Sequence, residues 1–423
     1  MVVGEKIHVA DKETLDKVYN ILAGEHSWGF IEHMDILSPS ERITPIGLNK
    51  DYTNVTRNAE TGVVSLNDWK NHPFIRANKP YMVKSDGTPD YMLSETDYTK
   101  KSDGTTDSDV SNTEYDGGAF AWLPRIYKYE KMDGNDRTVL FSMVERDGYT
   151  PNGFIDPDNN VLEGVWLPMF YGSRIGTDGD TPKMVSFAGL QPSYNTTADQ
   201  ERTAIRNFST RAQFLGGALV ETIIDFLMMI SGTCDLQGAF GYGNCSGHVN
   251  TAPTYGVKQN AVVGGGQFYG TDDQKSLNKI FHSIVLGSYQ QWQRDPYEVI
   301  VNGTVKISTN YAYDLTGKTY TNTGIKVPNF EGWRYPLRYQ TVSSYGSVPV
   351  VTYDGGSTAT GSCDGVYTSG SQSSKTAVAR RFGDCADGLA GGLRARNWRR
   401  PASAADWNVG ASDLLLPPVG VAV

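Results

Sequence analysis

The chain has 423 residues, of which 39% are hydrophobic and 11% aromatic, so it can bury a large core and is not a disordered protein. The formal net charge of −9 argues against a surface that follows the phosphates of nucleic acid, and we expect no nucleic-acid partner. The 46 glycines and the frequent Asn, Asp, Ser and Thr residues predict short strands joined by long loops, with helix in the minority.

Residues 1–60 are expected to attach the chain to a larger assembly or to oligomerise. Asp11 as an N-cap and Gly24 as a C-cap enclose one apolar stripe, which predicts a helix of about three turns. A helix this short needs a partner, either its own chain or another subunit. No basic region followed by a long apolar run marks a secretory signal, so we expect synthesis in the cytoplasm of the producing cell.

Residues 61–118 are expected to form a loop-rich connection. Their second half, residues 85–118, is acidic, rich in Gly and Thr and poor in aliphatic residues, which is typical of a surface loop. The spacing of Asp107 and Asp109 is that of some Ca²⁺ ligands, but the ordered run of oxygen ligands with a fixed glycine is missing. We therefore predict a solvated loop without a metal.

Residues 119–423 are expected to form one domain of the α+β class, with antiparallel strands and long loops. Two helical patterns cover residues 198–213 and 214–231. The second is apolar almost all round, which predicts a helix buried against a sheet. Its acidic residues Glu221 and Asp225 would be costly in a bilayer, so we expect no membrane insertion. Strand patterns cover residues 119–131, 137–145, 164–175, 299–308, 318–327 and 347–356.

The cysteines do not predict disulfides or a metal site. Four in a chain of this length are too few for a disulfide scaffold, and we expect them to be reduced, small, buried residues: Cys234, Cys245, Cys363 and Cys385. Cys245 and His248 have a ligand-like spacing but lack a second pair nearby. No nucleotide-binding glycine motif stands between a strand and a helix, so no cofactor is predicted.

Several blocks resemble, in their order along the chain, the C-type-lectin-like domains of phage tail proteins and of the variable proteins of diversity-generating retroelements, which share a scaffold with formylglycine-generating enzymes. The resemblance covers about 300 residues. In the block at residues 281–295, Gly287 and Trp292 match the family pattern, whereas the Asn and Glu of that pattern are replaced by other residues. The blocks are LPRIYKYEK (123–131), VWLPMFYGSR (165–174), DFLMMISGTCDLQGAFGYGN (225–244) and FHSIVLGSYQQWQRD (281–295).

The ending, residues 391–421, is similar to the variable-region ending of retroelement targets in gut phages. The matching residues are Pro401, Ser403, Trp407, Asn408, Gly410, Ala411 and Ser412. The resemblance implies a C-type-lectin-like fold with long loop insertions and a variable region at about residues 376–413. It also implies a virion receptor-binding protein at a phage tail tip or fibre, made in the host cytoplasm. Its implied partners are a bacterial surface receptor, protein or glycan, and other tail proteins, and we expect a homotrimer by analogy with tail fibres.

The composition of the ending provides an independent check. An Asn codon altered only at its adenines can encode Asp, Arg, Ser, Gly, Ala and others, but never Lys, Glu, Gln, Met or Trp. Residues 376–423 contain no Lys, Glu, Gln or Met, although about six would be expected from their share of the chain. All six cationic residues there are arginines and all four acidic residues are aspartates. This composition is what adenine-directed rewriting would leave.

The expected binding face is exposed, because a rewritable position must tolerate many side chains. Arginine suits it, since its planar fork binds carboxylate, phosphate or saccharide groups. A fixed scaffold held by packing or backbone hydrogen bonds is expected at Trp398, Trp407, Asn408 and Gly410. The variable face is predicted to comprise Asp384, Ala386, Asp387, Arg394, Arg396, Arg399, Arg400, Ala404 and Asp406.

Two alternatives stay open at this point. The first is a structural tail or baseplate component that recognises nothing itself. The second is a formylglycine-generating-type enzyme, which uses a nearby pair of cysteines late in the domain; Cys363 and Cys385 stand 22 residues apart without a local pair. We expect no catalytic residues and favour receptor binding.

Overall fold

The computed structural model describes residues 26–176, 181–262, 264–272, 278–352, 355–421 and 423. The helix expected between Asp11 and Gly24 lies outside these residues. The described chain is a mixed fold of helices and strands with 13% helix and 34% strand, so the prediction that helix is the minority is confirmed.

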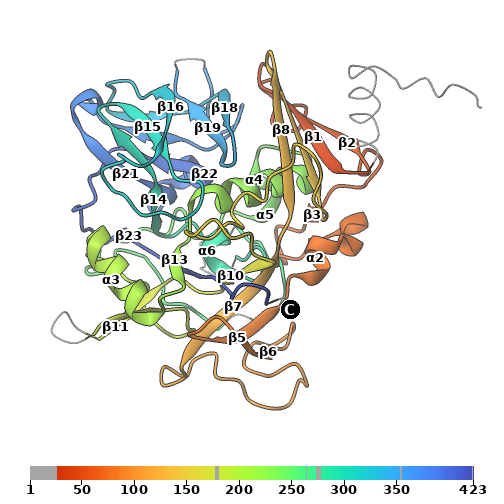
Figure 1. Cartoon of the computed structure of the whole chain (residues 1–423), viewed down its shortest axis with the longest axis vertical. Coiled ribbons are helices and arrows are strands. Elements are labelled where there is room, and N and C mark those ends of the chain that lie inside the picture. The colour runs from red at the N-terminus through yellow and green to blue at the C-terminus, as the bar shows by residue number, and fades with distance from the viewer. Residues whose placement is uncertain (1–25, 177–180, 263, 273–277, 353–354, 422) are drawn as a thin grey trace, which may run out of the picture.

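The first sheet is antiparallel and has four strands in the order β2-β1-β9-β8. It stands at the upper right of Figure 1, and β9 pairs with β1 on one side and with β8 on the other. Its strands are β1 (Trp28–His33), β2 (Ile43–Gly47), β8 (Tyr127–Asp133) and β9 (Asp136–Ser142). The strand pattern at residues 137–145 is thus confirmed, whereas the one at 119–131 is divided between β8 here and β7 (Gly117–Pro124) in the second sheet.

The second sheet has six strands in the order β13-β24-β10-β7-β5-β6 and passes through the centre of the molecule. Its middle strands β7 and β10 are buried on both faces, which explains their nearly continuous apolar sequence. The strands are β5 (Pro80–Lys84), β6 (Pro89–Met92), β7 (Gly117–Pro124), β10 (Gly164–Pro168), β13 (Ala212–Phe214) and β24 (Asp413–Leu415).

The third sheet has eight strands, in the order β16-β15-β14-β21-β22-β20-β17, with β23 pairing in parallel with β14. It lies at the upper left of Figure 1. The strands are β14 (Trp292–Val301), β15 (Thr304–Ile307), β16 (Thr321–Lys326), β17 (Gly332–Arg334), β20 (Val366–Thr368), β21 (Thr376–Phe382), β22 (Gly392–Asn397) and β23 (Val409–Gly410). This sheet carries most of the C-terminal segment that the sequence singled out.

The remaining elements are short. Three strand pairs are β3 (Thr56–Arg57) with β4 (Val64–Ser65), β11 (Ser173–Ile175) with β12 (Lys183–Val185), and β18 (Arg338–Val342) with β19 (Gly346–Val350). The short helices are η1 (Asn67–Asn71), α2 (Pro73–Ala77), α5 (Leu236–Phe240), α6 (Ile284–Gly287), η2 (Gln372–Ser374) and η3 (Gly388–Ala390).

Both helices expected in the middle of the chain are present as α3 (Ala198–Phe208) and α4 (Gly217–Ser231). The patterns placed helix over residues 209–216 as well, and this is wrong, because residues 212–214 form strand β13. Thr197 and Gln200 form a capping box at the start of α3. Every residue of α4 is buried, as its apolar sequence predicts. In Figure 1 α4 lies between the first and third sheets. Its acidic residue Glu221 accepts a hydrogen bond from Arg381 of the third sheet, and Asp225 accepts one from Arg137 of the first sheet.

The sheets cross the boundaries that the sequence suggested at residues 60 and 118. Strand β1 pairs with β9 on one side and with β2 on the other, and β5 and β6 extend the sheet of β7. Trp69 and Phe74 are fully buried in the main core. The segment expected to be a loop-rich connection therefore contributes strands and core residues, although residues 102–107 are exposed as a surface loop should be. The sequence pattern of 85–118 hides this because the apolar residues that anchor it are few and far apart.

Candidate functional site

A pocket of about 190 Å³ is lined by residues of the third sheet, from β14, β17, β20, β21 and β22, and by the loops that follow β21 and β22. Three aromatic side chains from different strands form part of its wall, and the remaining lining is charged or amide-bearing. We call it the terminal pocket. Its lining residues are Trp292, Trp333, Tyr367, Arg380, Asp384, Asp387, Asn397, Arg399, Arg400, Asp406 and Asn408.

The pairing of β21 with β22 determines which arginines reach the terminal pocket. Arg380 pairs with Asn397, and Arg381 with Arg396. Because successive side chains of a strand point to opposite faces, the first pair faces the pocket and the second faces the interior. Asn397 and Arg380 accordingly line the pocket, whereas the second pair contacts buried carboxylates.

The inward arginines are neutralised by acidic residues of α4 and β14. Arg381 donates to Glu221 at 2.5 Å and to Glu298 at 2.9 Å, and Arg396 donates to the same Glu221 oxygen at 2.5 Å. Burial alone would lower the pKa of Arg381, but the carboxylates around it, Glu298 first among the charged groups, raise that pKa well above its ordinary value. Arg381 therefore stays charged in the interior, and both arginines have a structural role there.

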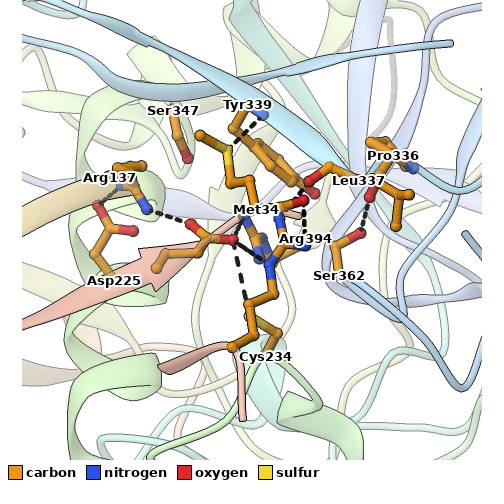
Figure 2. A network of polar contacts seen from close by, with 12 residues as sticks. Met34, Arg137, Asp225, Cys234, Pro336, Leu337, Tyr339, Ser347, Ser362 and Arg394 are labelled. Carbon is orange, nitrogen blue, oxygen red and sulfur yellow. Dashed lines mark hydrogen bonds and ion pairs between the residues drawn. The ribbon is translucent and has the colours of Figure 1, made fainter. Parts of the chain in front are cut away.

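Arg394 belongs to a second buried network, which ties β22 to the first sheet (Figure 2). Its guanidinium contacts Glu32 of β1 at 3.3 Å and lies 3.8 Å from the ring centroid of Tyr339. Glu32 also binds Arg42 and Arg137, and these arginines keep its pKa far below the ordinary value although burial acts in the opposite direction. Figure 2 shows Arg137 in turn reaching Asp225 of α4.

The prediction that the variable face is exposed to solvent is therefore wrong for three of its residues. Arg394 and Arg396 are 1% and 0% exposed, and Asp384 is 3% exposed. The physical reason is strand alternation: residues 394 and 396 point together toward the buried acids, so they cannot contact a large ligand. Of the other predicted residues, Ala386 is exposed and five are half-buried at the surface: Asp387, Arg399, Arg400, Ala404 and Asp406.

Asp384 and Asp387 form a carboxyl pair at one end of the terminal pocket. The indole of Trp292 hydrogen-bonds to both, and the amide of Asn408 donates to Asp384 at 2.5 Å. Burial raises the pKa of both carboxyls, and the negative charge of Asp384 helps to raise the pKa of Asp387 to about 8. Near neutral pH the pair therefore retains a proton that a ligand oxygen can accept as a hydrogen bond.

The predicted scaffold residues lie around this pair. Trp398 is fully buried and donates its indole N–H to Glu298. Gly410 is buried in β23, where an added Cβ would lie 2.4 Å from the carbonyl oxygen of Ser193. The side-chain amide of Asn408 donates a hydrogen bond to the carboxylate of Asp384, as expected for a residue that holds a loop in place. Trp407 is only half-buried and packs against Tyr255, with ring centroids 5.1 Å apart.

Sequence reasoning missed five residues of the pocket wall. Arg380 and Asn397 lay within the singled-out segment but carried no signal of their orientation. The aromatic residues come from distant strands: Trp292 stacks on Trp333 at 6.1 Å, and Trp333 meets Tyr367 edge to face at 5.2 Å. Only the strand register could have placed them beside the C-terminal loops.

The cysteines are all buried and free, as expected. Burial raises the thiol pKa of Cys385 to about 12 and raises that of Cys363 further, which is opposite to the shift that activates a nucleophilic thiolate. Among the described residues, no group of three or more His, Cys, Asp or Glu side chains is arranged to hold a metal ion. The geometry of the terminal pocket is that of a binding site with polar and aromatic walls.

No protein-family model matches this chain, and a comparison with curated proteins gives no match. Within the described part of the chain, none of the helices has the length and apolar character needed to cross a membrane.

Proposed function

We propose that the chain is the host-recognition protein of a bacteriophage tail, with a C-type-lectin-like fold whose C-terminal loops form the binding face. One observation carries the proposal: the segment that resembles a retroelement variable region supplies most of the lining of the terminal pocket. These residues include Asp387, Arg399, Arg400 and Asp406, which lie at the surface and can change without disturbing the core.

The division between changeable and fixed positions supports the same proposal. Arg399 and Arg400 follow β22 and are half-buried at the pocket rim, with Arg399 lying 5.5 Å from the ring of Tyr367. Trp398, between them and the strand, is fully buried. A rewritable binding face requires buried residues that hold the backbone in place beside surface residues whose side chains can be exchanged.

Binding of the purified, fluorescently labelled full chain to host cells tests this function, with competition against phage adsorption as a second readout. The double variant Arg399→Ser with Arg400→Ser should lose or redirect binding while its melting temperature changes little. The matched control is Arg76→Ser with Arg338→Ser, because both arginines are exposed and neither lines the pocket. Full binding by a folded pocket variant would contradict the proposed face, and no binding by the wild type would favour a structural tail component.

We also propose that the protein acts as a homotrimer in the virion, because several identical weak sites bind a cell surface more tightly than one. Sedimentation equilibrium at micromolar concentration measures this directly. A monomer under those conditions would overturn the trimer without affecting the recognition function of the pocket.

A further inference from the structure

Arg380 is a buried cation that forms no ion pair with any of the residues that the structure describes. Its side chain lines the terminal pocket, yet the residue is only 2% exposed. Its Nε and Nη2 atoms are buried and have no hydrogen-bond partner among the described residues. Burying a guanidinium in this way is costly unless something pairs with it, so the arrangement indicates a ligand group that does.

The residues beside Arg380 do not supply that group. Arg294, which pairs with Arg380 across β14 and β21, forms an ion pair with the nearby carboxylate of Glu201 at 2.5 Å. Burial first, and then the charge of Arg294, lower the pKa of Arg380 to about 9, although Glu201 and Asp406 act in the opposite direction. Asp406 offsets part of this positive charge from across the pocket, but two nitrogens of Arg380 stay without a hydrogen-bond partner among the described residues.

The chemistry of the pocket favours a carboxylate over a phosphate. A guanidinium fork binds a carboxylate through two parallel hydrogen bonds. Asp384, Asp387 and Asp406 line the same pocket, so a doubly charged phosphate would meet more repulsion than a singly charged carboxylate. The raised pKa of Asp387 lessens this repulsion and leaves an O–H donor for a neutral ligand oxygen.

The other walls fit the body of a sugar. Trp333 and Tyr367 provide apolar ring surfaces for C–H groups, and Asn397 provides an amide. The Oδ1 atom of Asn408 is buried without a hydrogen-bond partner among the described residues, so it can accept from a hydroxyl. The volume of about 190 Å³ lies below the roughly 300–1,000 Å³ of drug-sized sites, which suits one sugar unit.

We infer that the terminal pocket binds one carboxylate-bearing sugar unit of a bacterial surface polysaccharide, with Arg380 holding the carboxylate and Asn408 and the Asp384–Asp387 pair holding hydroxyl groups. This inference rests on the proposed recognition function and adds the chemical class of the receptor. It assigns the specificity to a buried arginine of β21, while the rim residues Arg399 and Arg400 contact whatever surrounds that sugar.

The test uses polysaccharide extracted from host cells, before and after carbodiimide-activated reduction of its carboxyl groups to alcohols. The full chain should bind the untreated polysaccharide and lose at least tenfold in affinity for the reduced one, as measured by biolayer interferometry. Glucuronic and galacturonic acid should compete at millimolar concentration, whereas glucose, galactose, acetate and inorganic phosphate at the same concentration should not.

Arg380→Met gives the residue-level test because it keeps the stem of the side chain and removes the fork. It should abolish the preference for the unreduced polysaccharide while the protein stays folded, since an unpaired buried charge is also removed. Arg338→Met is the matched control on an exposed arginine outside the pocket. Equal binding before and after reduction, equal competition by phosphate, or an unchanged preference in Arg380→Met would each overturn the inference. If the wild-type protein did not bind host cells at all, the proposed function itself would be overturned.

Discussion

Arg380 and Arg381 are neighbours on β21 and face opposite sides of the third sheet. Arg380 points into the terminal pocket with two nitrogens that lack a partner among the described residues. Arg381 points inward and forms ion pairs with three acids, of which Asp295 lies 2.9 Å from its Nε. Two chemically identical residues thus have opposite surroundings: one lacks a partner at a pocket wall, and the other is paired with acids in the interior.

Arg381→Met should therefore destabilise the protein strongly. It leaves Glu221, Asp295 and Glu298 with one less cation in a buried site, and breaking such a network costs about 3–5 kcal/mol. Arg380→Met should change the free energy of unfolding by much less and can raise it. Urea unfolding followed by circular dichroism measures both values. A similar decrease in the free energy of unfolding of the two variants would contradict the different roles assigned to Arg380 and Arg381.

The two tryptophans of the C-terminal segment should differ in the same measurement. Trp398 is fully buried and its indole bonds to Glu298, so Trp398→Ala should cost about 3–5 kcal/mol. Trp407 is half-buried against Tyr255 and His248, so the loss in Trp407→Ala should be smaller. The sequence suggested one scaffold role for both. A larger loss at Trp407 would contradict the observed difference in burial.

How far the sequence predicts this fold depends on the range of the interactions. Local patterns were sufficient for α4, whose apolar sequence and complete burial agree, and for strands such as β9. Long-range pairing was not predictable: nothing in the sequence of β1 or β5 shows that they pair with strands after residue 117. The N-terminal part therefore looked separable although it shares the core.

The candidate site shows the same limit at the level of single side chains. The composition of residues 376–423 pointed to the segment that lines the pocket, but not to the face on which each side chain lies. Arg394 and Arg396 are two residues apart in a strand, so they had to share a face, and that face is the buried one. Their acidic partners come from β1, α4 and β14, which no local pattern connects with β22.

The carboxyl pair predicts how stability depends on pH. The pKa of Asp387 is raised to about 8, so the folded state binds more protons than the unfolded state above pH ~4. Its contribution to stability is fully present at low pH and is lost as the pH rises through about 8. Asp387→Asn should remove this loss, because the amide oxygen can still accept from the Asp384 backbone N–H. The variant should therefore gain melting temperature relative to the wild type at pH 9 but not at pH 4; equal differences at both values would contradict the assignment.

The last prediction concerns residues 119–423, which the sequence suggested would fold alone. Their separation from the N-terminal part would remove β1 and β5 from their sheets and expose the core around Trp69.

It would also remove Glu32, the buried carboxylate that both Arg137 and Arg394 contact. Arg394 would then lose the carboxylate that pairs with it, whereas Arg137 would keep Glu130 and Asp225. A buried cation without its partner costs several kcal/mol, a large share of the stability of an ordinary domain. We expect the 119–423 fragment to lack the cooperative thermal transition and near-ultraviolet circular dichroism of the full chain. Protease cleavage within the exposed residues 102–107 of the intact protein is the matched control, because β5 and β6 remain on the sheet: the nicked pieces should elute together in gel filtration and separate only in denaturant. A fragment that unfolds cooperatively at the temperature of the full chain would show instead that the N-terminal strands are dispensable and that the buried network does not unite the two parts.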